Sequence, residues 1–260
     1  MKRLEARIAG IGLCAPGLPD WATGRALLAG EADWAESAEL GRLAPEMLPA
    51  NERRRTTVLI RLALQAAQQA LDGHQGEVPS VFASSGGDLE IVDRILQAQQ
   101  MPGRPVSPTH FHNSVHNAPA GYASIARRDP APSTSLSAHD ASLAVGLLDA
   151  LARLAAGDEA VLLVAYDHPP PPTLAPFRPL LAPFALALML RAEGAGPRLW
   201  AQPATDGESR LNRPALERLR SGNPAARGLP LLERLAREEA GTVHLPMPRG
   251  TLAVTLEPEA

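Results

Sequence analysis

The sequence predicts an α/β protein in which helices cover both faces of a sheet. Residues 160–166 and 184–191 are almost entirely apolar, which is typical of strands that are buried on both faces. Residues 56–71 fit a helix whose polar side chains share one narrow stripe, so most of its circumference should be buried. Aromatic residues make up 3% of the chain, so alanine and leucine must fill closely packed layers. The expected architecture is a layered αβα fold around a parallel or mixed sheet.

Strand-like and helix-like segments alternate along the chain. Strands are predicted at residues 7–13, 78–83, 133–137, 160–166, 184–191 and 251–256. Helices are predicted at residues 56–71, 89–100 and 140–156, and in two pieces within 206–240. Asp88 is placed to cap the helix at 89–100. Four consecutive prolines exclude helix and central strand from residues 168–183, which should form a long surface connection.

Composition narrows the class of protein. A length of 260 residues suits one large domain or two small ones. A net charge of −3 and an isoelectric point of about 6.2 do not suggest a nucleic-acid surface. The basic run Arg53, Arg54 and Arg55 precedes a helix and is interpreted as its solvated entrance. Cys14 is the single cysteine, so a reducing, cytoplasmic compartment is expected. It lies in or at the end of the first predicted strand and should belong to the core.

The N-terminus has a weak likeness to a targeting segment, because Lys2 and Arg3 precede an apolar stretch. Glu5 interrupts the basic region, and Gly10 and Gly12 break the apolar one, so a first strand is expected instead. The longest apolar runs of the chain are too short to span a membrane.

Residues 133–143 combine a short strand with a sharp turn into a buried helix. The start of such a helix offers free backbone N–H groups and a positive dipole end, where nucleophilic thiolates are often placed. Here the side chain is the imidazole of His139, which the dipole should keep neutral. A neutral His139 could act as a base toward Ser137 or Ser142, with Asp140 as its orienting partner. A G-x-S-x-G elbow is absent, so a packed or capping role is the preferred interpretation.

Three histidines, His110, His112 and His116, lie within seven residues. The spacing of His112 and His116 would place both on one face of a helix, where they could bind zinc. Asn113 stands where an H-E-x-x-H motif would need glutamate, and the sequence offers no third ligand nearby. Structural hydrogen bonding is therefore preferred, and no metal or cofactor is predicted.

Together these segments resemble the N-terminal half of β-ketoacyl synthases, which belong to the thiolase superfamily. Ser107-Pro108 precedes Asn117 and Gly121, as a Ser-Pro segment precedes an Asn-x-x-x-Gly helix in that family. The block Ala138-His139-Asp140-Ala141-Ser142-Leu143 then resembles the family's Ala-Cys-Ser-Ser elbow, with His139 at the position of the nucleophilic cysteine. Residues 147–164 are similar to the helix, Gly-Asp turn and strand that follow it.

The resemblance implies a thiolase-like fold with an intact N-terminal half and a truncated C-terminal half. It divides the chain into a ketosynthase-like part, residues 1–200, and a remnant, residues 201–260. The sheet should be mostly parallel, with residues 251–256 as an added strand. Residues 250–254 resemble the family's closing G-T-N-A-H segment, with Val254 at the position of a catalytic histidine. The family's other catalytic histidine and its lysine have no counterpart.

The joint loss of the cysteine and the histidines implies that the chain is not a condensing enzyme. By resemblance it is a chain-length-factor-like protein of the short kind found in aryl polyene and xanthomonadin-type pathways. Such a protein pairs with a complete β-ketoacyl synthase and helps to shape its acyl tunnel. The resemblance thus implies a heterodimer, with an acyl carrier protein as a second candidate partner and a homodimer when the chain is expressed alone.

The resemblance also places two segments at the subunit boundary. In the family, the strand before the elbow pairs across the dimer axis, and the residues after Ser-Pro reach into the partner's tunnel. Carried over, the interface strand comprises Ser133, Thr134, Ser135, Leu136 and Ser137, and the tunnel residues are Thr109, His110 and Phe111.

Two alternatives stay open. An altered acyl decarboxylase or hydrolase would use His139, although most of the half that supplies a histidine pair is missing. A homodimeric module that binds acyl groups or a carrier protein would need no such chemistry. A complete synthase encoded beside this gene would favour the heterodimer.

Overall fold

A computed structural model describes residues 4–35, 38–103 and 105–259. In this part of the chain eight strands form one sheet, in the order β3-β2-β4-β5-β1-β6-β8-β7. The strands are β1 (Glu5–Cys14), β2 (Ser80–Ala83), β3 (Ser133–Leu136), β4 (Ala160–Asp167), β5 (Phe184–Arg191), β6 (Arg198–Ala204), β7 (Gly241–Pro246) and β8 (Thr251–Glu257). Strand β8 confirms the strand predicted near the end of the chain.

The sheet is mixed, so the predicted mostly parallel pairing is wrong. Strand β2 pairs in parallel with β3 and β4, whereas the other described pairings are antiparallel. Parallel neighbours need a crossover connection. The segment 168–183 instead returns the chain from β4 to its direct neighbour β5, and β6, β8 and β7 extend the sheet beyond β1 in the same antiparallel way.

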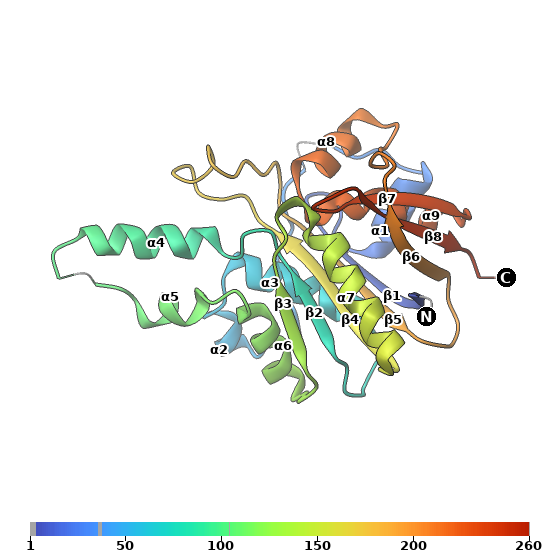
Figure 1. Ribbon diagram of the computed structural model, residues 1–260. Helices are drawn as coiled ribbons and strands as arrows, with labels where there is room; N and C mark the ends of the chain where they lie inside the picture. The colour runs from blue at the N-terminus through green and yellow to red at the C-terminus, as the bar shows by residue number, and fades with distance from the viewer. Residues whose placement is uncertain (1–3, 36–37, 104, 260) are drawn as a thin grey trace.

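Helices cover both faces of the sheet, which confirms the layered αβα architecture (Figure 1). The helices α3 (Val58–Ala70) and α6 (Ala118–Arg127) pack on one face. The other face is covered by α1 (Trp21–Ala29), α7 (Ser142–Ala156), α8 (Pro214–Gly222) and α9 (Leu229–Arg237). Side chains of β4 alternate between the two layers, which explains why its sequence is apolar throughout.

Two glycines let α3 pack directly against β1. A Cβ atom at Gly12 would lie 1.9 Å from the carbonyl oxygen of Ala66, and one at Gly10 would lie 2.1 Å from that of Ala70. Cys14, at the end of β1, is buried in the same layer, and burial raises the pKa of its thiol to about 12. The prediction that Cys14 belongs to the core is confirmed.

The remaining helical segments are α2 (Ala50–Arg53), α4 (Leu89–Gln100), α5 (Pro108–Asn113), η1 (His139–Ala141) and η2 (Ala225–Gly228). Helices α4 and α5 form an arm that extends away from the sheet (Figure 1). Asp88 caps α4 as predicted, since its Oδ1 accepts a hydrogen bond from the Ile91 amide at 3.1 Å. None of the helices in the described ranges combines the length and apolarity needed to cross a membrane.

The sequence prediction missed the helices α1, α2 and α5 and the strands β6 and β7. Both strands carry a proline and polar residues, and they are ordered by antiparallel pairing with β8. Strand β6 (Arg198–Ala204) spans the proposed boundary between residues 200 and 201. The two proposed parts therefore share one sheet, and their division stays a prediction.

Candidate functional site

The carboxyl ends of the three parallel strands β3, β2 and β4 meet at one edge of the sheet. Ser84 follows β2, Asp167 ends β4, and the turn to His139 follows β3. In open α/β sheets this edge is the usual place for ligands and chemistry. It brings together the elbow that the sequence singled out and a carboxylate that it did not.

The elbow has the predicted strand–turn–helix form. His139 has a φ of 51°, a left-handed conformation that is uncommon for residues other than glycine. Ser142 closes the turn, because its hydroxyl accepts from the Ala138 amide at 3.0 Å and donates to the His139 carbonyl at 2.7 Å. The turn leads into α7 and leaves the His139 side chain at the surface.

Of the packed or capping role preferred for His139, the packed role is wrong. Its side chain is 73% exposed. Its Nε2 lies 2.9 Å from Nη1 of Arg178, and its Nδ1 lies 3.3 Å from Oδ1 of Asp140. A guanidinium can only donate, so Nε2 is the acceptor in this arrangement. The side chain is thus held by a cation from the proline-rich segment.

The serines near His139 do not form a hydrolase pair with it. The Ser137 hydroxyl donates to the Ser85 carbonyl at 2.9 Å, and the Ser142 hydroxyl donates to the His139 carbonyl at 2.7 Å. Both hydroxyl protons therefore point to backbone oxygens, and the imidazole is not placed to remove either of them.

Ion pairs connect the elbow with the C-terminal part of the chain. Asp140 lies 2.8 Å from Arg178 and 3.7 Å from Arg227. Glu208 lies 3.0 Å from both Arg227 and the buried Arg220. Because these partners come from distant segments, the network fixes the segment 168–183 and the C-terminal helices against the elbow.

Asp167 is a buried carboxyl group beside the elbow. Its Oδ1 accepts hydrogen bonds from the Ser84 hydroxyl at 3.0 Å and from the Ser85 amide and hydroxyl at 2.8 Å each. Burial raises its pKa from 3.8 to about 6, although these hydrogen bonds and Arg178 favour the charged form. Sequence reasoning missed Asp167, and the available signal was a carboxylate that directly ends the apolar run 160–166.

The histidine cluster does not form the zinc-binding helix face. Helix α5 ends at Asn113, so His112 and His116 do not share a helix. His116 Nε2 lies 3.2 Å from the Ser84 carbonyl, and the His112 ring packs edge-on against Tyr122. Over the described ranges, no group of three or more histidine, cysteine or carboxylate side chains could hold a metal ion.

The proposed tunnel residues lie on α5, in the projecting arm. Thr109 is exposed, His110 is half-buried, and Phe111 is 70% exposed. His110 and Thr109 line a cavity of about 290 Å³ between the arm and the body. All three side chains are therefore at or near the surface.

The proposed interface strand is β3 (Ser133–Leu136), followed by Ser137. It forms one edge of the sheet and pairs only with β2 among the described strands. Val254, at the proposed position of a lost histidine, is fully buried in β8, where it pairs with Ala201 and Val243. Val254 thus contributes to the apolar core.

Comparisons with known proteins place this geometry in a family. The family described as "Beta-ketoacyl synthase, N-terminal domain" matches residues 28–249. None of the curated proteins matches the sequence. Among solved structures, a ketosynthase in complex with its chain length factor from Xenorhabdus doucetiae matches with a TM-score of 0.74 and 26% identity. That match covers 97% of this chain and 98% of the matched chain.

Two further structures match over nearly the whole chain. The ishigamide ketosynthase/chain length factor matches with a TM-score of 0.72 and 16% identity, covering 96% of this chain and 98% of that one. A type II acyl carrier protein in complex with its ketosynthase matches with a TM-score of 0.76 and 14% identity. That match covers 99% of this chain and 100% of the matched chain. At these identities the two matches show the fold alone, and the family model with the Xenorhabdus doucetiae match confirms the thiolase-like ketosynthase type in truncated form.

Proposed function

Because this chain belongs to the β-ketoacyl synthase N-terminal domain family, we propose that it is a non-catalytic subunit resembling a chain length factor. It would pair with an active β-ketoacyl synthase and help to shape the acyl tunnel of that enzyme. Mutual coverage of nearly whole chains with a ketosynthase–chain length factor complex supports the partner role. An aryl polyene or xanthomonadin-type pathway belongs to the same proposal and is supported by the sequence resemblance.

The observation that carries this proposal is the side chain at the elbow. His139 has a left-handed backbone conformation in the turn that precedes α7. The family resemblance expects the nucleophilic cysteine at this position. The His139 Nε2 accepts a hydrogen bond from Arg178, so the lone pair that could attack a thioester is occupied. An elbow that retains its backbone but holds its side chain in this way fits a structural role.

The two edges of the sheet differ in a way that favours a partner at β3. At the β7 edge, the Ser209 amide donates to the His244 carbonyl at 3.0 Å and the His244 amide donates to the Ser209 hydroxyl at 2.9 Å, so the chain itself pairs the outward main chain at the middle of this edge. Strand β3 has no neighbour on its outer side among the described strands. An open edge offers unpaired backbone groups that another subunit can bind.

Exposed apolar side chains on the arm support the same partner. Between α4 and the turn after α5, the exposed large apolar residues are Val92, Leu96, Met101, Phe111 and Val115. A projecting arm with such residues is typical of a surface that a second protein covers. In the proposed complex, Thr109, His110 and Phe111 approach the acyl tunnel of the ketosynthase.

The proposal also concerns the wider assembly. A heterodimer with a ketosynthase is its main form, and a homodimer is expected when the chain is produced alone. An acyl carrier protein is a further candidate partner, as is suggested by the matching complex of a ketosynthase with a carrier protein. Cytoplasmic location is part of the proposal and accords with the single buried cysteine.

Co-expression with a ketosynthase encoded beside the gene tests this function. We expect a stable complex by size-exclusion chromatography, and no condensation by this chain alone. Ser133→Lys, which puts a charge on the open edge, should weaken the complex at least tenfold. The matched variant Thr242→Lys, on the opposite edge strand, should leave complex formation unchanged.

Two results would overturn the proposal. One is that Ser133→Lys forms the complex as well as the wild type does, while Phe111→Ala leaves the acyl products of the complex unchanged. The other is hydrolysis or decarboxylation of acyl thioesters by the isolated chain that disappears in His139→Ala. The second result would establish the altered-chemistry alternative.

A further inference from the structure

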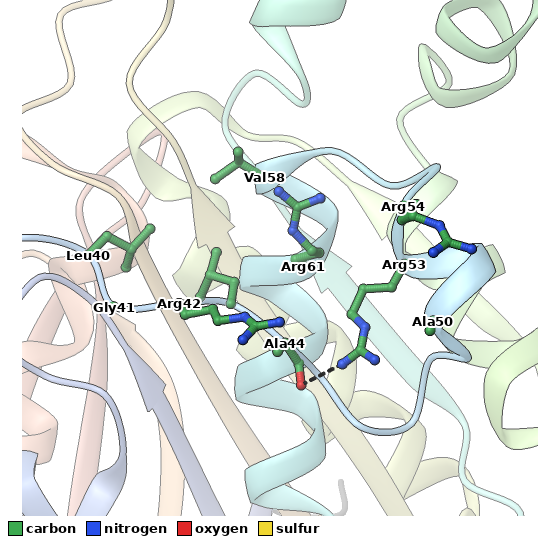
Figure 2. A pocket seen from close by; sticks show the side chains of 10 residues that line it. Leu40, Gly41, Arg42, Ala44, Ala50, Arg53, Arg54, Val58 and Arg61 are labelled. Atoms are coloured by element: carbon green, nitrogen blue, oxygen red, sulfur yellow. Dashed lines mark hydrogen bonds between the residues drawn. The ribbon is translucent and has the colours of Figure 1, made fainter.

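A cavity of about 580 Å³ lies between α2, the first turn of α3 and the segment before α2 (Figure 2). Four arginines line it: Arg42, Arg53, Arg54 and Arg61. In Figure 2 the guanidinium groups of Arg42 and Arg53 extend toward each other from opposite walls. The sequence interpretation of the basic run as a solvated helix entrance is therefore incomplete, because two of its residues face a hollow.

These arginines have no ion-pair partner among the described residues, although Asp88 and Glu90 line an adjoining cavity that Arg54 and Arg61 also line. No aspartate or glutamate lines the cavity itself. Arg53 Nη1 donates to the Ala44 carbonyl at 3.2 Å, and Arg61 Nη1 donates to the Thr56 carbonyl at 2.6 Å. Carbonyl oxygens orient these groups but leave their full positive charge in place.

This arrangement contrasts with three arginines near the elbow. Arg178, Arg220 and Arg227 each lie within 3.7 Å of at least one carboxylate. Burial lowers the pKa of Arg61, so the cavity disfavours that charge unless an anion is present. Val58, the first residue of α3, also lines the cavity, so the positive end of a 13-residue helix adds to the field.

We propose that this cavity binds a small organic phosphate ester with two or more negative charges. A guanidinium group can donate two parallel N–H hydrogen bonds to the oxygens of a phosphate group. Four arginines around one cavity can therefore bind more than one phosphate group. The volume is that of a small-molecule site. Leu40, Leu43 and Val58 provide apolar wall for the organic part of the ligand.

The geometry favours a phosphate ester over an acidic protein. A carboxylate presents two oxygens in one plane, whereas a terminal phosphate presents three in different directions, which suits donors from several walls. Arg42 and Arg54 are exposed, whereas Arg53 and Arg61 are half-buried, so a small ligand can reach all four more readily than an acidic protein surface can. This inference does not depend on the proposed pairing with a ketosynthase.

Isothermal titration calorimetry with the full chain at low salt tests the inference. The probes are ADP, inorganic pyrophosphate and a decaglutamate peptide. We expect ADP and pyrophosphate to bind saturably, and Arg42→Gln/Arg53→Gln to weaken both at least tenfold. The control Arg25→Gln/Arg237→Gln removes the same charge from exposed ion pairs with Glu238 and Glu233, and should change binding less than twofold.

Each other outcome overturns the inference. Absence of saturable binding of both phosphate compounds would do so, as would equal weakening by the control pair, which would indicate general charge attraction. Tighter binding of decaglutamate than of ADP would assign the cavity to an acidic protein. If circular dichroism shows that the double variant is unfolded, the single variant Arg42→Gln replaces it in the titration. This variant should weaken ADP binding at least threefold.

Discussion

Replacing Asp167 by asparagine should change how stability depends on pH. Asp167 has a pKa raised from 3.8 to about 6, so the folded state binds its proton more tightly than the unfolded state. The stabilising effect of that proton is fully present below pH 3.8 and is lost as the pH rises through 6. At 1.36 kcal/mol per unit the whole loss is about 3 kcal/mol, of which about 1.4 kcal/mol falls between pH 5 and 7.5.

Asparagine cannot ionise, so Asp167→Asn removes this loss. Its Oδ1 can still accept from Ser84 and Ser85, but its amide would replace Oδ2, which has no hydrogen-bond partner. The unpaired amide should cost about 1–3 kcal/mol at every pH. The stability of the variant relative to wild type should therefore improve by about 1.4 kcal/mol between pH 5 and 7.5.

Urea unfolding, followed by circular dichroism at four pH values over this range, measures the difference. Asp33→Asn removes the same charge at an exposed position and should give a curve parallel to that of the wild type. A constant difference between Asp167→Asn and the wild type would refute the reasoning. It would mean that the Asp167 carboxyl group is already ionised at pH 5 in the folded protein.

Three further predictions concern the elbow, the arm and the core. His139→Cys should show no condensation of acyl and malonyl thioesters in a mass-spectrometric assay, because a lone cysteine lacks the histidine pair that stabilises the enolate; detectable product would contradict this. Phe111→Ala in the co-expressed complex should preserve assembly and lengthen or broaden the acyl products, whereas an unchanged product profile would remove the tunnel role. Gly12→Ala should lower the free energy of unfolding by about 3 kcal/mol or more, because its Cβ would lie 1.9 Å from the Ala66 carbonyl oxygen. The control Gly121→Ala, on an open face of α6, should shift it by less than about 1 kcal/mol, and equal effects would contradict the packing argument.

Sequence analysis located the elements whose burial produces a local pattern of apolar residues. Helix α3 and strands β4 and β5 are buried around most of their surface, so their apolar patterns are almost continuous. Strands β6 and β7 are half-exposed and are ordered by pairing with β8, which lies elsewhere in the sequence. Strand direction failed for the same reason, because local patterns do not encode the neighbour of a strand.

In the candidate site, too, local features could be predicted and contacts between distant segments could not. The elbow could be predicted from residues 133–143, because its strand, turn and helix are contiguous. Arg178 could not, since it reaches His139 from 39 residues away in a segment that was interpreted as solvated surface. Asp167 and Ser84 are 83 residues apart and meet only because β2 and β4 are parallel neighbours. Contacts of this kind depend on topology and leave no local signal.

The two ends of the sheet bear on the proposed role of this chain as a subunit. Strands β6, β8 and β7 extend the sheet beyond β1, and Ser209 pairs with the main chain of His244 in the last strand. The opposite side ends in the four-residue strand β3, which carries three hydroxyl side chains. Short polar edges resist uncontrolled pairing, yet they can bind a matched strand backbone to backbone. A chain whose C-terminal strands extend one side of the sheet and whose other side ends in an open edge is therefore suited to the proposed pairing with one partner.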